Sequence, residues 1–316
     1  MRQLVDPDLL PGLDLIPGLA LSEASLPTIR ATMEEIASLA PEPANSGVSW
    51  RDAAVRSPDG HEVPVRIYTP DGDSGLRPAI LQIHGGGYVM GSHRLSHAAN
   101  LGIAAEADAV IVAVDYRLAP ETTAPGAVED CHAALAWLAT EADGLGVDPT
   151  RIAVRGESAG GGLAAALCLF ARDRGGPAII HQNLIYPMLD DRTCITQLPE
   201  HLGAFVWPPE ANAFGWRALL GGPPGAGTVP DYAVAARAES LTALPAAFIA
   251  VGGLDLFLLE DLDYARRLIE AGVPSELHIY PGAYHGFDVV ADAPPAQRMR
   301  RDAVLALRRA LHPVEA

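Results

Sequence analysis

Lysine is absent from this chain, and its 22 positively charged side chains other than histidine are all arginine. Without a lysine amine the protein cannot form a Schiff base, hold a Ser-x-x-Lys nucleophile pair or complete a Gly-Lys-Ser/Thr phosphate loop. The net charge is −17 over 316 residues. Because no basic patch is available to release counterions, we expect no nucleic-acid partner and no binding to anionic membranes.

Cysteine and long apolar runs are also scarce. Cys131, Cys168 and Cys194 lie far apart without Cys-x-x-Cys spacing, which is typical of reduced thiols in a cytosolic protein. No uncharged apolar run reaches about 18 residues, and no basic-then-apolar signal segment is present. We therefore expect a cytoplasmic protein without stable membrane insertion.

Short runs rich in Ile and Val alternate with helical patterns from residue 79 onward. This alternation favours a mostly parallel sheet with helices on both faces. Upstream, two extended segments at 48–57 and 63–70 predict an antiparallel hairpin. The later elements are expected as strands at 79–84, 109–116, 151–156, 178–187, 246–253 and 275–281, and as helices at 92–106, 127–140, after Ser158, at 260–271 and up to about Leu311.

The alternation breaks between Pro187 and Pro245, over a stretch too long for a structureless loop in a compact domain. We interpret it as a helical cap at the carboxyl ends of the strands, where open α/β sheets bind ligands. A helix at 26–39, closed by the run PEPANSG, is expected to join it. The predicted division is an N-terminal cap segment (1–45), a first core part (46–186), a cap insertion (187–244) and a second core part (245–316).

Gly156-Glu157-Ser158-Ala159-Gly160 stands where a predicted strand ends and a helix begins. Such a sharp turn forces its central residue to a positive φ angle, and glycine at the flanking positions removes Cβ atoms that would collide. The turn exposes the Ser158 hydroxyl and places the Ala159 amide at a helix N-terminus, which stabilises negative charge. We interpret Ser158 as a nucleophile rather than an ordinary helix N-cap.

A serine nucleophile requires a base, and an imidazole base requires an acid that fixes its tautomer. Of the ten histidines, His285 lies in a glycine-flanked loop after the last predicted strand. Asp255 follows the preceding strand and is expected to lie level with Ser158 and His285. The order Ser–Asp–His along the chain is that of α/β-hydrolases.

Other titratable residues fit less well. Glu260, Asp261 and Asp263 fall in the helix after Asp255, and we expect them to be solvated. His93 and His97 have the spacing of a helical metal pair, but neither a third ligand nor an HExxH pattern accompanies them. We therefore predict no metal site.

His84-Gly85-Gly86-Gly87 follows the strand at 79–84. Consecutive glycines let backbone N–H groups approach an oxyanion without side-chain collision, and each donor contributes roughly 3–4 kcal/mol in the transition state. His84 is expected to orient this loop rather than to transfer protons.

The motifs HGGGYVMG, DYRLAPE, GESAGG, LDLF and AYHGF occur in that order between about residue 60 and the C-terminus. In this combination the chain resembles the hormone-sensitive-lipase-like bacterial esterases, also called family IV. The resemblance implies an α/β-hydrolase fold with a mostly parallel eight-stranded sheet and a helical cap. It also implies a nucleophile, a base and its acid at Ser158, His285 and Asp255, and oxyanion donors at Gly86, Gly87 and Ala159.

The same resemblance implies a carboxylesterase acting on short- to medium-chain acyl esters without a cofactor. Many relatives dimerise through their last strands, which here correspond to residues 275–280. Glu157 departs from the Asp or Thr that many members carry in the elbow, and we expect it to make structural hydrogen bonds there. Aromatic residues are expected to line the substrate pocket or else to pack the cap onto the sheet: Tyr88, Phe205, Trp207, Phe214 and Trp216.

Two alternatives stay open from sequence. The same triad serves lactonase, amidase, deacetylase or acyltransferase chemistry, because the pocket decides among them. A non-catalytic small-molecule receptor of hydrolase shape is the other alternative. It is disfavoured because His285, which receptors resembling this family have lost, is retained here.

Overall fold

The computed structural model describes residues 1–15, 20–39, 46–72, 75–225 and 227–313. Eight strands form one sheet in the order β1-β2-β4-β3-β5-β6-β7-β8. The pairs β1–β2 and β2–β4 are antiparallel and all other neighbours are parallel, which confirms the predicted hairpin and the mostly parallel sheet. The strands are β1 (Val48–Arg56), β2 (Glu62–Pro70), β3 (Arg77–Ile83), β4 (Val110–Val114), β5 (Val147–Glu157), β6 (His181–Ile185), β7 (Ala246–Gly252) and β8 (Ser275–Tyr280).

The helices follow the predicted order with small shifts at their ends. The α-helices are α1 (Gly12–Leu15), α2 (Leu26–Leu39), α3 (His97–Ala107), α4 (Gly126–Thr140), α5 (Ala142–Leu145), α6 (Ala159–Arg174), α7 (Pro209–Leu220), α8 (Leu258–Glu270) and α9 (Pro294–Leu311). Short 3₁₀ turns are η1 (Arg2–Leu4), η2 (Pro7–Leu9), η3 (Asp191–Cys194), η4 (Ala235–Arg237) and η5 (Phe287–Val289). Helix α3 begins at His97 rather than at residue 92, because the preceding segment bonds elsewhere: the His93 amide donates to Asp115 Oδ1 at 3.2 Å.

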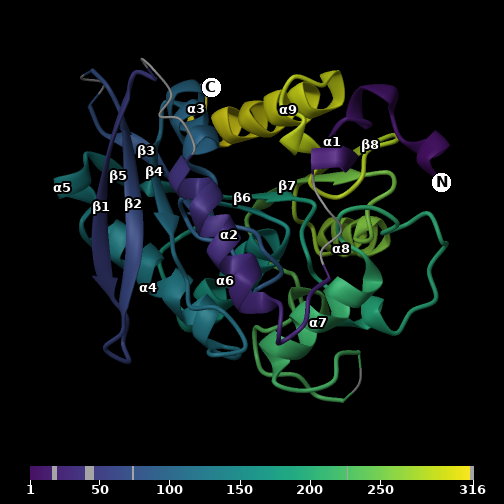
Figure 1. The fold of residues 1–316 in the computed structure, drawn as a ribbon. Coiled ribbons are helices and arrows are strands. Elements are labelled where there is room, and N and C mark those ends of the chain that lie inside the picture. Colours follow the sequence, from purple (N-terminus) through teal and green to yellow (C-terminus); the bar gives the residue numbers. More distant parts are fainter. Residues whose placement is uncertain (16–19, 40–45, 73–74, 226, 314–316) are drawn as a thin grey trace.

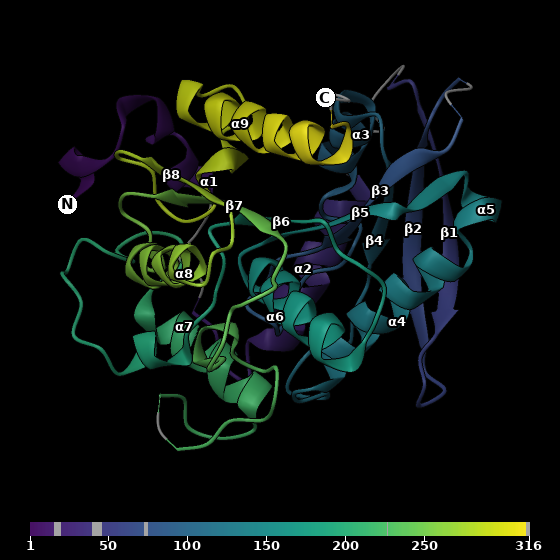
Figure 2. The same ribbon diagram turned by 180° about the vertical axis from the view of Figure 1, so that it is seen from behind.

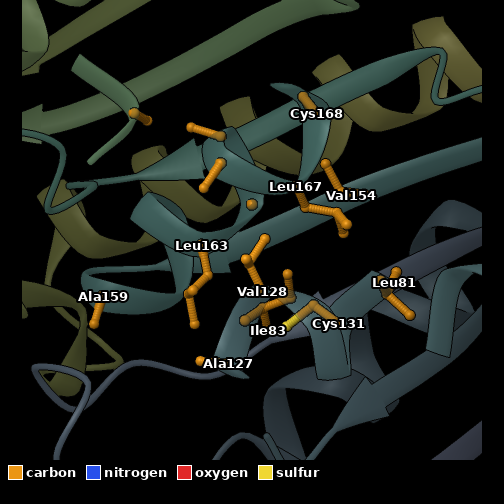
Figure 3. Close-up of a cluster of buried hydrophobic side chains, with 14 of the residues drawn as sticks. Leu81, Ile83, Ala127, Val128, Cys131, Val154, Ala159, Leu163, Leu167 and Cys168 are labelled. Carbon is orange, nitrogen blue, oxygen red and sulfur yellow. The ribbon is translucent and has the colours of Figure 1, made fainter. Parts of the chain in front are cut away.

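Helices cover both faces of the sheet (Figures 1 and 2). Leu81, Ile83 and Val154 point to the face covered by α4, α6 and α8, and Figure 3 shows them packed with side chains of α4 and α6. Ile80 and Ala153 point to the opposite face, toward α3 and α9. Because both faces are buried, the central strands are apolar along most of their length, and each buried aliphatic side chain contributes roughly 1.5–3 kcal/mol.

Apart from residue 226, which is not described, the stretch from 187 to 244 contains one α-helix, α7, between irregular segments and the turns η3 and η4. Pro209 occupies the first turn of α7, where its missing N–H costs nothing, and Gly221 ends the helix with a left-handed φ of 65°. The run PEPANSG and the predicted boundary at residue 45 fall largely on residues 40–45, outside the described residues. The division into cap and core stays a prediction.

Two further expectations concern cysteines and membranes. The three cysteines are free, with Cys131 and Cys168 buried and Cys194 half-buried. Within the described ranges, no helix has both the length and the apolar character needed to cross a membrane.

Candidate active site

Ser158 occupies the sharp turn between β5 and α6. Its φ of 55° and ψ of −121° are unusual for a residue with a side chain. The flanking glycines are sterically required: a Cβ on Gly156 would lie 2.2 Å from the Gly160 carbonyl oxygen, and a Cβ on Gly160 would lie 2.1 Å from the Ile83 carbonyl oxygen. The local sequence therefore permits a turn that holds the serine in this strained conformation.

The three residues of the predicted triad are brought together by the loops after β5, β7 and β8. Ser158 Oγ lies 2.9 Å from His285 Nε2, and His285 Nδ1 lies 2.9 Å from Asp255 Oδ2. The other Asp255 oxygen accepts from the Phe257 amide at 3.0 Å. A proton on Nδ1, bonded to Asp255, leaves the Nε2 lone pair facing the serine hydroxyl. All three side chains are buried, Asp255 completely.

The glycine loop, residues 85–91, lies beside the nucleophile. A Cβ on Gly85 would lie 3.4 Å from Ser158 Cβ, and one on Gly86, which has a φ of 123°, would meet the Met90 carbonyl oxygen at 2.0 Å. In the described part of the chain, the Gly86 and Gly87 amides donate to no protein acceptor. The Ala159 amide opens α6 and therefore has no acceptor within the helix. These amides are available to an anion.

Comparison with known proteins decides the family. A family model described as the alpha/beta hydrolase fold matches residues 80–289. The chain belongs to this family. It is 36% identical to the esterase LipI of Mycobacterium tuberculosis, over 98% of this chain and 97% of LipI. It is 32% identical to an ethyl acetate hydrolase of Pseudomonas putida, over 82% of this chain and 81% of that protein.

A solved structure named bacterial heroin esterase matches the hydrolase with a TM-score of 0.91 at 39% identity, covering 98% of this chain and 99% of the other. The relatives confirm three predictions: the α/β-hydrolase fold, membership among the bacterial esterases and the enzyme class, a carboxylic ester hydrolase.

Aromatic rings enclose the imidazole of this hydrolase. The His285 ring centroid lies 4.8 Å from that of Tyr186, 5.1 Å from that of Phe257 and 6.2 Å from that of Trp207. Tyr186 has a positive φ of 36°, and its hydroxyl donates to Asp288 Oδ1 at 2.7 Å. Burial raises the pKa of Tyr186 well above its usual value, so the hydroxyl stays a donor. Sequence reasoning missed Tyr186 because the predicted strand at 178–187 included it, whereas β6 ends at Ile185 and leaves Tyr186 at the site.

His84 and Glu157 make contacts that stabilise the glycine loop and the nucleophile elbow, respectively. The buried His84 ring stacks on Tyr116 at 4.2 Å, and its Nδ1 lies 2.8 Å from the Gly85 carbonyl oxygen, which it faces as a donor. Burial lowers the pKa of His84, which favours the neutral ring. Glu157 accepts from Gln82 Nε2 at 2.7 Å and pairs with Arg155. These are the structural hydrogen bonds expected of Glu157.

The five aromatic residues expected at the pocket occupy different environments. Trp207 lies against both the glycine loop and His285: a Cβ on Gly87 would lie 2.3 Å from its ring. Tyr88 donates its hydroxyl to the Met188 carbonyl oxygen at 2.7 Å, and the fully buried Trp216 packs on its ring. Phe205 packs near Tyr284, and Phe214 packs against the main core. A role in substrate binding stays a prediction for all five.

The expectation that Glu260 and Asp261 are solvated is wrong. Both are buried, while Asp263 is exposed as predicted. Glu260 accepts from the amides of Leu189 at 2.7 Å and Asp190 at 3.2 Å, and from the Thr193 hydroxyl. The sequence predicted solvent exposure because acidic residues are common at the start of a helix. In the structure, residues 189–193 cover the start of α8.

The two histidines with helical spacing do not converge. His93 Nδ1 lies 3.4 Å from Asp115 Oδ1, whereas His97 Nδ1 lies 3.0 Å from the Tyr68 hydroxyl. Among the residues that the structure describes, no group of three His, Cys, Asp or Glu side chains is arranged to hold a metal ion.

Proposed function

We propose that the protein is a serine carboxylesterase that hydrolyses short- to medium-chain acyl esters through an acyl-enzyme. The observation that carries this proposal is the chain of two 2.9 Å hydrogen bonds from Ser158 through His285 to Asp255. It lies beside three amides that are available to a developing negative charge. A nucleophile, a base, an orienting acid and an oxyanion site are the parts that acyl transfer requires.

In the first half of the reaction Ser158 Oγ attacks the ester carbonyl carbon while His285 Nε2 takes the hydroxyl proton. Asp255 holds the Nδ1 proton and stabilises the imidazolium that forms. The carbonyl oxygen becomes an oxyanion, which the amides of Gly86, Gly87 and Ala159 stabilise. Losing one such donor typically lowers kcat by about 10²- to 10³-fold.

In the second half the tetrahedral intermediate collapses, the carbon–oxygen bond to the alcohol breaks, and His285 gives its proton to the leaving alkoxide. Water then attacks the acyl-enzyme as His285 accepts a proton from it. Collapse of the second intermediate releases the carboxylic acid and returns the proton to Ser158. Each step uses only side chains, amides and water, so the proposed route requires no cofactor.

Two observations favour short acyl groups. One similar protein is named for ethyl acetate, a short-chain ester. In this chain the Trp207 ring packs onto Gly87 and is itself 3% exposed, which narrows the space beside the oxyanion amides. Rates measured across straight-chain esters from acetyl to dodecanoyl should therefore fall at the long end.

The decisive variant is Ser158→Ala. We expect kcat to fall by about 10³-fold or more, because the covalent route is lost. Ser240→Ala, at an exposed position outside the helices and strands, is the matched control and should leave kcat unchanged. Full activity in Ser158→Ala would end the proposal. Labelling of Ser158 by an organophosphate separates an enzyme from a receptor, and product analysis with added alcohol separates hydrolysis from acyl transfer.

We also propose a cytoplasmic location and a homodimer joined through β8, with no nucleic-acid partner. The net charge of −17 supports the last of these. Strand β8 lies at one end of the sheet with Ile279 44% exposed, and such an edge favours pairing with another strand. Light scattering should give twice the chain mass of 33.1 kDa, and Ile279→Lys should reduce it.

A further inference from the structure

Helix α2 is attached to the rest of the hydrolase mainly by polar groups. Most of its residues are exposed; Leu26 is buried, and Ile29 and Met33 are only partly buried against the main core. So small an apolar contact does not by itself hold a helix in one position. In Figure 1 α2 lies in front of the strands; in Figure 2, which is seen from behind, it lies on the far side.

One guanidinium makes the central polar contact of this helix. Arg30 Nε donates to the Val89 carbonyl oxygen at 2.6 Å, and Arg30 Nη2 donates to the Ala119 carbonyl oxygen at 2.8 Å. Glu121 neutralises the charge through bonds of 2.8 and 2.9 Å. Val89 and Ala119 are 0% and 1% exposed, so protein rather than bulk water must satisfy their carbonyls.

Both carbonyls belong to the framework of the glycine loop. The Val89 amide donates to the Gly86 carbonyl oxygen at 3.1 Å, which closes the turn that presents the Gly86 and Gly87 amides. The Ala119 amide donates to the Tyr88 carbonyl oxygen at 2.9 Å. Arg30 therefore ties the glycine loop, at Val89, to the neighbouring segment at Ala119.

Hydrogen bonds also connect the glycine loop to the nucleophile elbow. The Tyr88 hydroxyl donates to the Met188 carbonyl oxygen at 2.7 Å, and the Met188 amide donates to the Ser158 carbonyl oxygen at 2.9 Å. The loop is therefore linked to the elbow on one side and to Arg30 on the other. We therefore expect a shift of the loop on its Arg30 side to change the distance between the loop amides and Ser158 Oγ.

We infer that Arg30 is a positioning residue that holds the glycine loop at the distance from Ser158 at which its amides stabilise the oxyanion. The inference rests on the proposed function. Without the guanidinium, two buried carbonyls lose their donors and the loop relaxes to recover other bonds. Because catalytic groups must be placed closely, a displacement of about 1 Å can lower the rate roughly 10²-fold.

The test compares Arg30→Met with Arg94→Met. Methionine keeps most of the apolar stem and removes the donors. Arg94 links the same helix to the segment after the loop through Glu34 at 2.9 Å, but both side chains are about half exposed, at 47% and 51%. Arg94→Met thus loosens α2 without removing a donor to the loop carbonyls. Arg30→Lys, which supplies a point charge instead of a planar fork, is the conservative variant.

For Arg30→Met we expect kcat on a chromogenic acetate ester to fall by about 10- to 100-fold while KM changes less than about threefold. The affinity for a trifluoromethyl ketone, which forms a tetrahedral oxyanion adduct with a catalytic serine, should fall in parallel. Arg30→Lys should lie between wild type and Arg30→Met. Arg94→Met should match wild type in all three measurements.

Wild-type kcat and ketone affinity in both Arg30 variants would overturn the inference. So would an equal loss in Arg94→Met, because α2 would then act only as a general anchor. If Arg30→Met does not fold, Arg30→Lys decides: a loss of kcat without ketone weakening contradicts the inference. Ser158→Ala keeps the two proposals apart, since an inactive Ser158→Ala beside a fully active Arg30→Met overturns only this one.

Discussion

The nucleophile elbow is fixed differently from two segments that cover neighbouring parts of the site, here called the covering segments. They are α2, which bonds to Val89 and Ala119, and the described part of residues 187–244, which places Trp207 beside His285. At the elbow, backbone hydrogen bonds fix the serine. The Ser158 amide donates to the Ile185 carbonyl oxygen, and the Ser158 carbonyl oxygen accepts from the amides of Gly162 and Met188. In the covering segments, charged side chains bond to groups that are distant in sequence. Arg30 reaches Val89, and Arg237 makes a forked pair with the buried Asp191.

The two means of fixation suit different tasks: the elbow must hold the serine rigidly, whereas the covering segments must be placed correctly over their neighbours. The elbow uses missing Cβ atoms and short backbone bonds, which leave little freedom for the serine. The covering segments use side chains whose partners are distant in sequence. Such polar contacts specify position without adding large apolar area. Variants in the two regions should therefore fail in different ways.

The largest expected effect is on the triad acid. Asp255→Asn keeps the shape of the side chain, but its amide can donate to His285 Nδ1 and stabilise the wrong tautomer. Nε2 would then carry the proton and could not accept one from Ser158, so we expect kcat to fall roughly 10⁴-fold. Asp263→Asn, on the exposed face of α8, is the control in the same kinetic assay. A kcat near that of wild type in Asp255→Asn would contradict the assigned role.

The next effect concerns the elbow's backbone. Gly160→Ala places a Cβ 2.1 Å from the Ile83 carbonyl oxygen, which is backbone and cannot move aside cheaply. We expect a loss of more than about 4 kcal/mol in the free energy of unfolding, measured by urea titration, or failure to fold. The control is Gly102→Ala on the exposed face of α3, where nothing lies within 4 Å. Gly102→Ala should raise the free energy of unfolding by about 0.5–1 kcal/mol.

A third variant breaks the covering segments instead. Asp191→Asn removes the charge from a fully buried carboxylate that accepts from Arg237 at 2.7 and 2.8 Å and from the Gly225 amide at 2.6 Å. Arg237, whose side chain is 18% exposed, would lose its counter-ion, at a cost of about 3–5 kcal/mol.

Hydrogen exchange should locate the Asp191→Asn loss within residues 187–244, leaving β5 and α6 protected. Asp263→Asn, which breaks an exposed pair with Arg266, should leave exchange unchanged. Equal loss of protection in the elbow would show that the two regions are not separately held.

The same contrast explains what sequence could predict. The elbow, the order of the triad and the glycine loop were predictable because their requirements are local: a glycine two residues away or a loop after a strand. The partners of Arg30 were not, since Val89 and Ala119 come next to it only in the folded chain. The buried Glu260 was mistaken for a solvated helix-start residue for the same reason, because residues 189–193 cover it.

The smallest expected effect, and the only stabilising one among these predictions, concerns the buried Asp261. Both carboxylate oxygens lack a hydrogen-bond partner within the described residues. Burial, followed by the nearby charges of Glu260 and Asp255, raises its pKa well above 3.8. Because its pKa is higher in the folded state than in the unfolded state, Asp261 lowers the free energy of unfolding least below pH 3.8 and more as the pH rises.

Asp261→Ala should therefore stabilise the protein by roughly 1–3 kcal/mol at neutral pH, and the gain should shrink on acidification. Urea titrations at several pH values test this, with the exposed Asp263→Ala as a control expected to show no such trend. A gain independent of pH would point to shape rather than charge, and a destabilised Asp261→Ala would reveal a role for the carboxylate that its unpaired oxygens do not suggest.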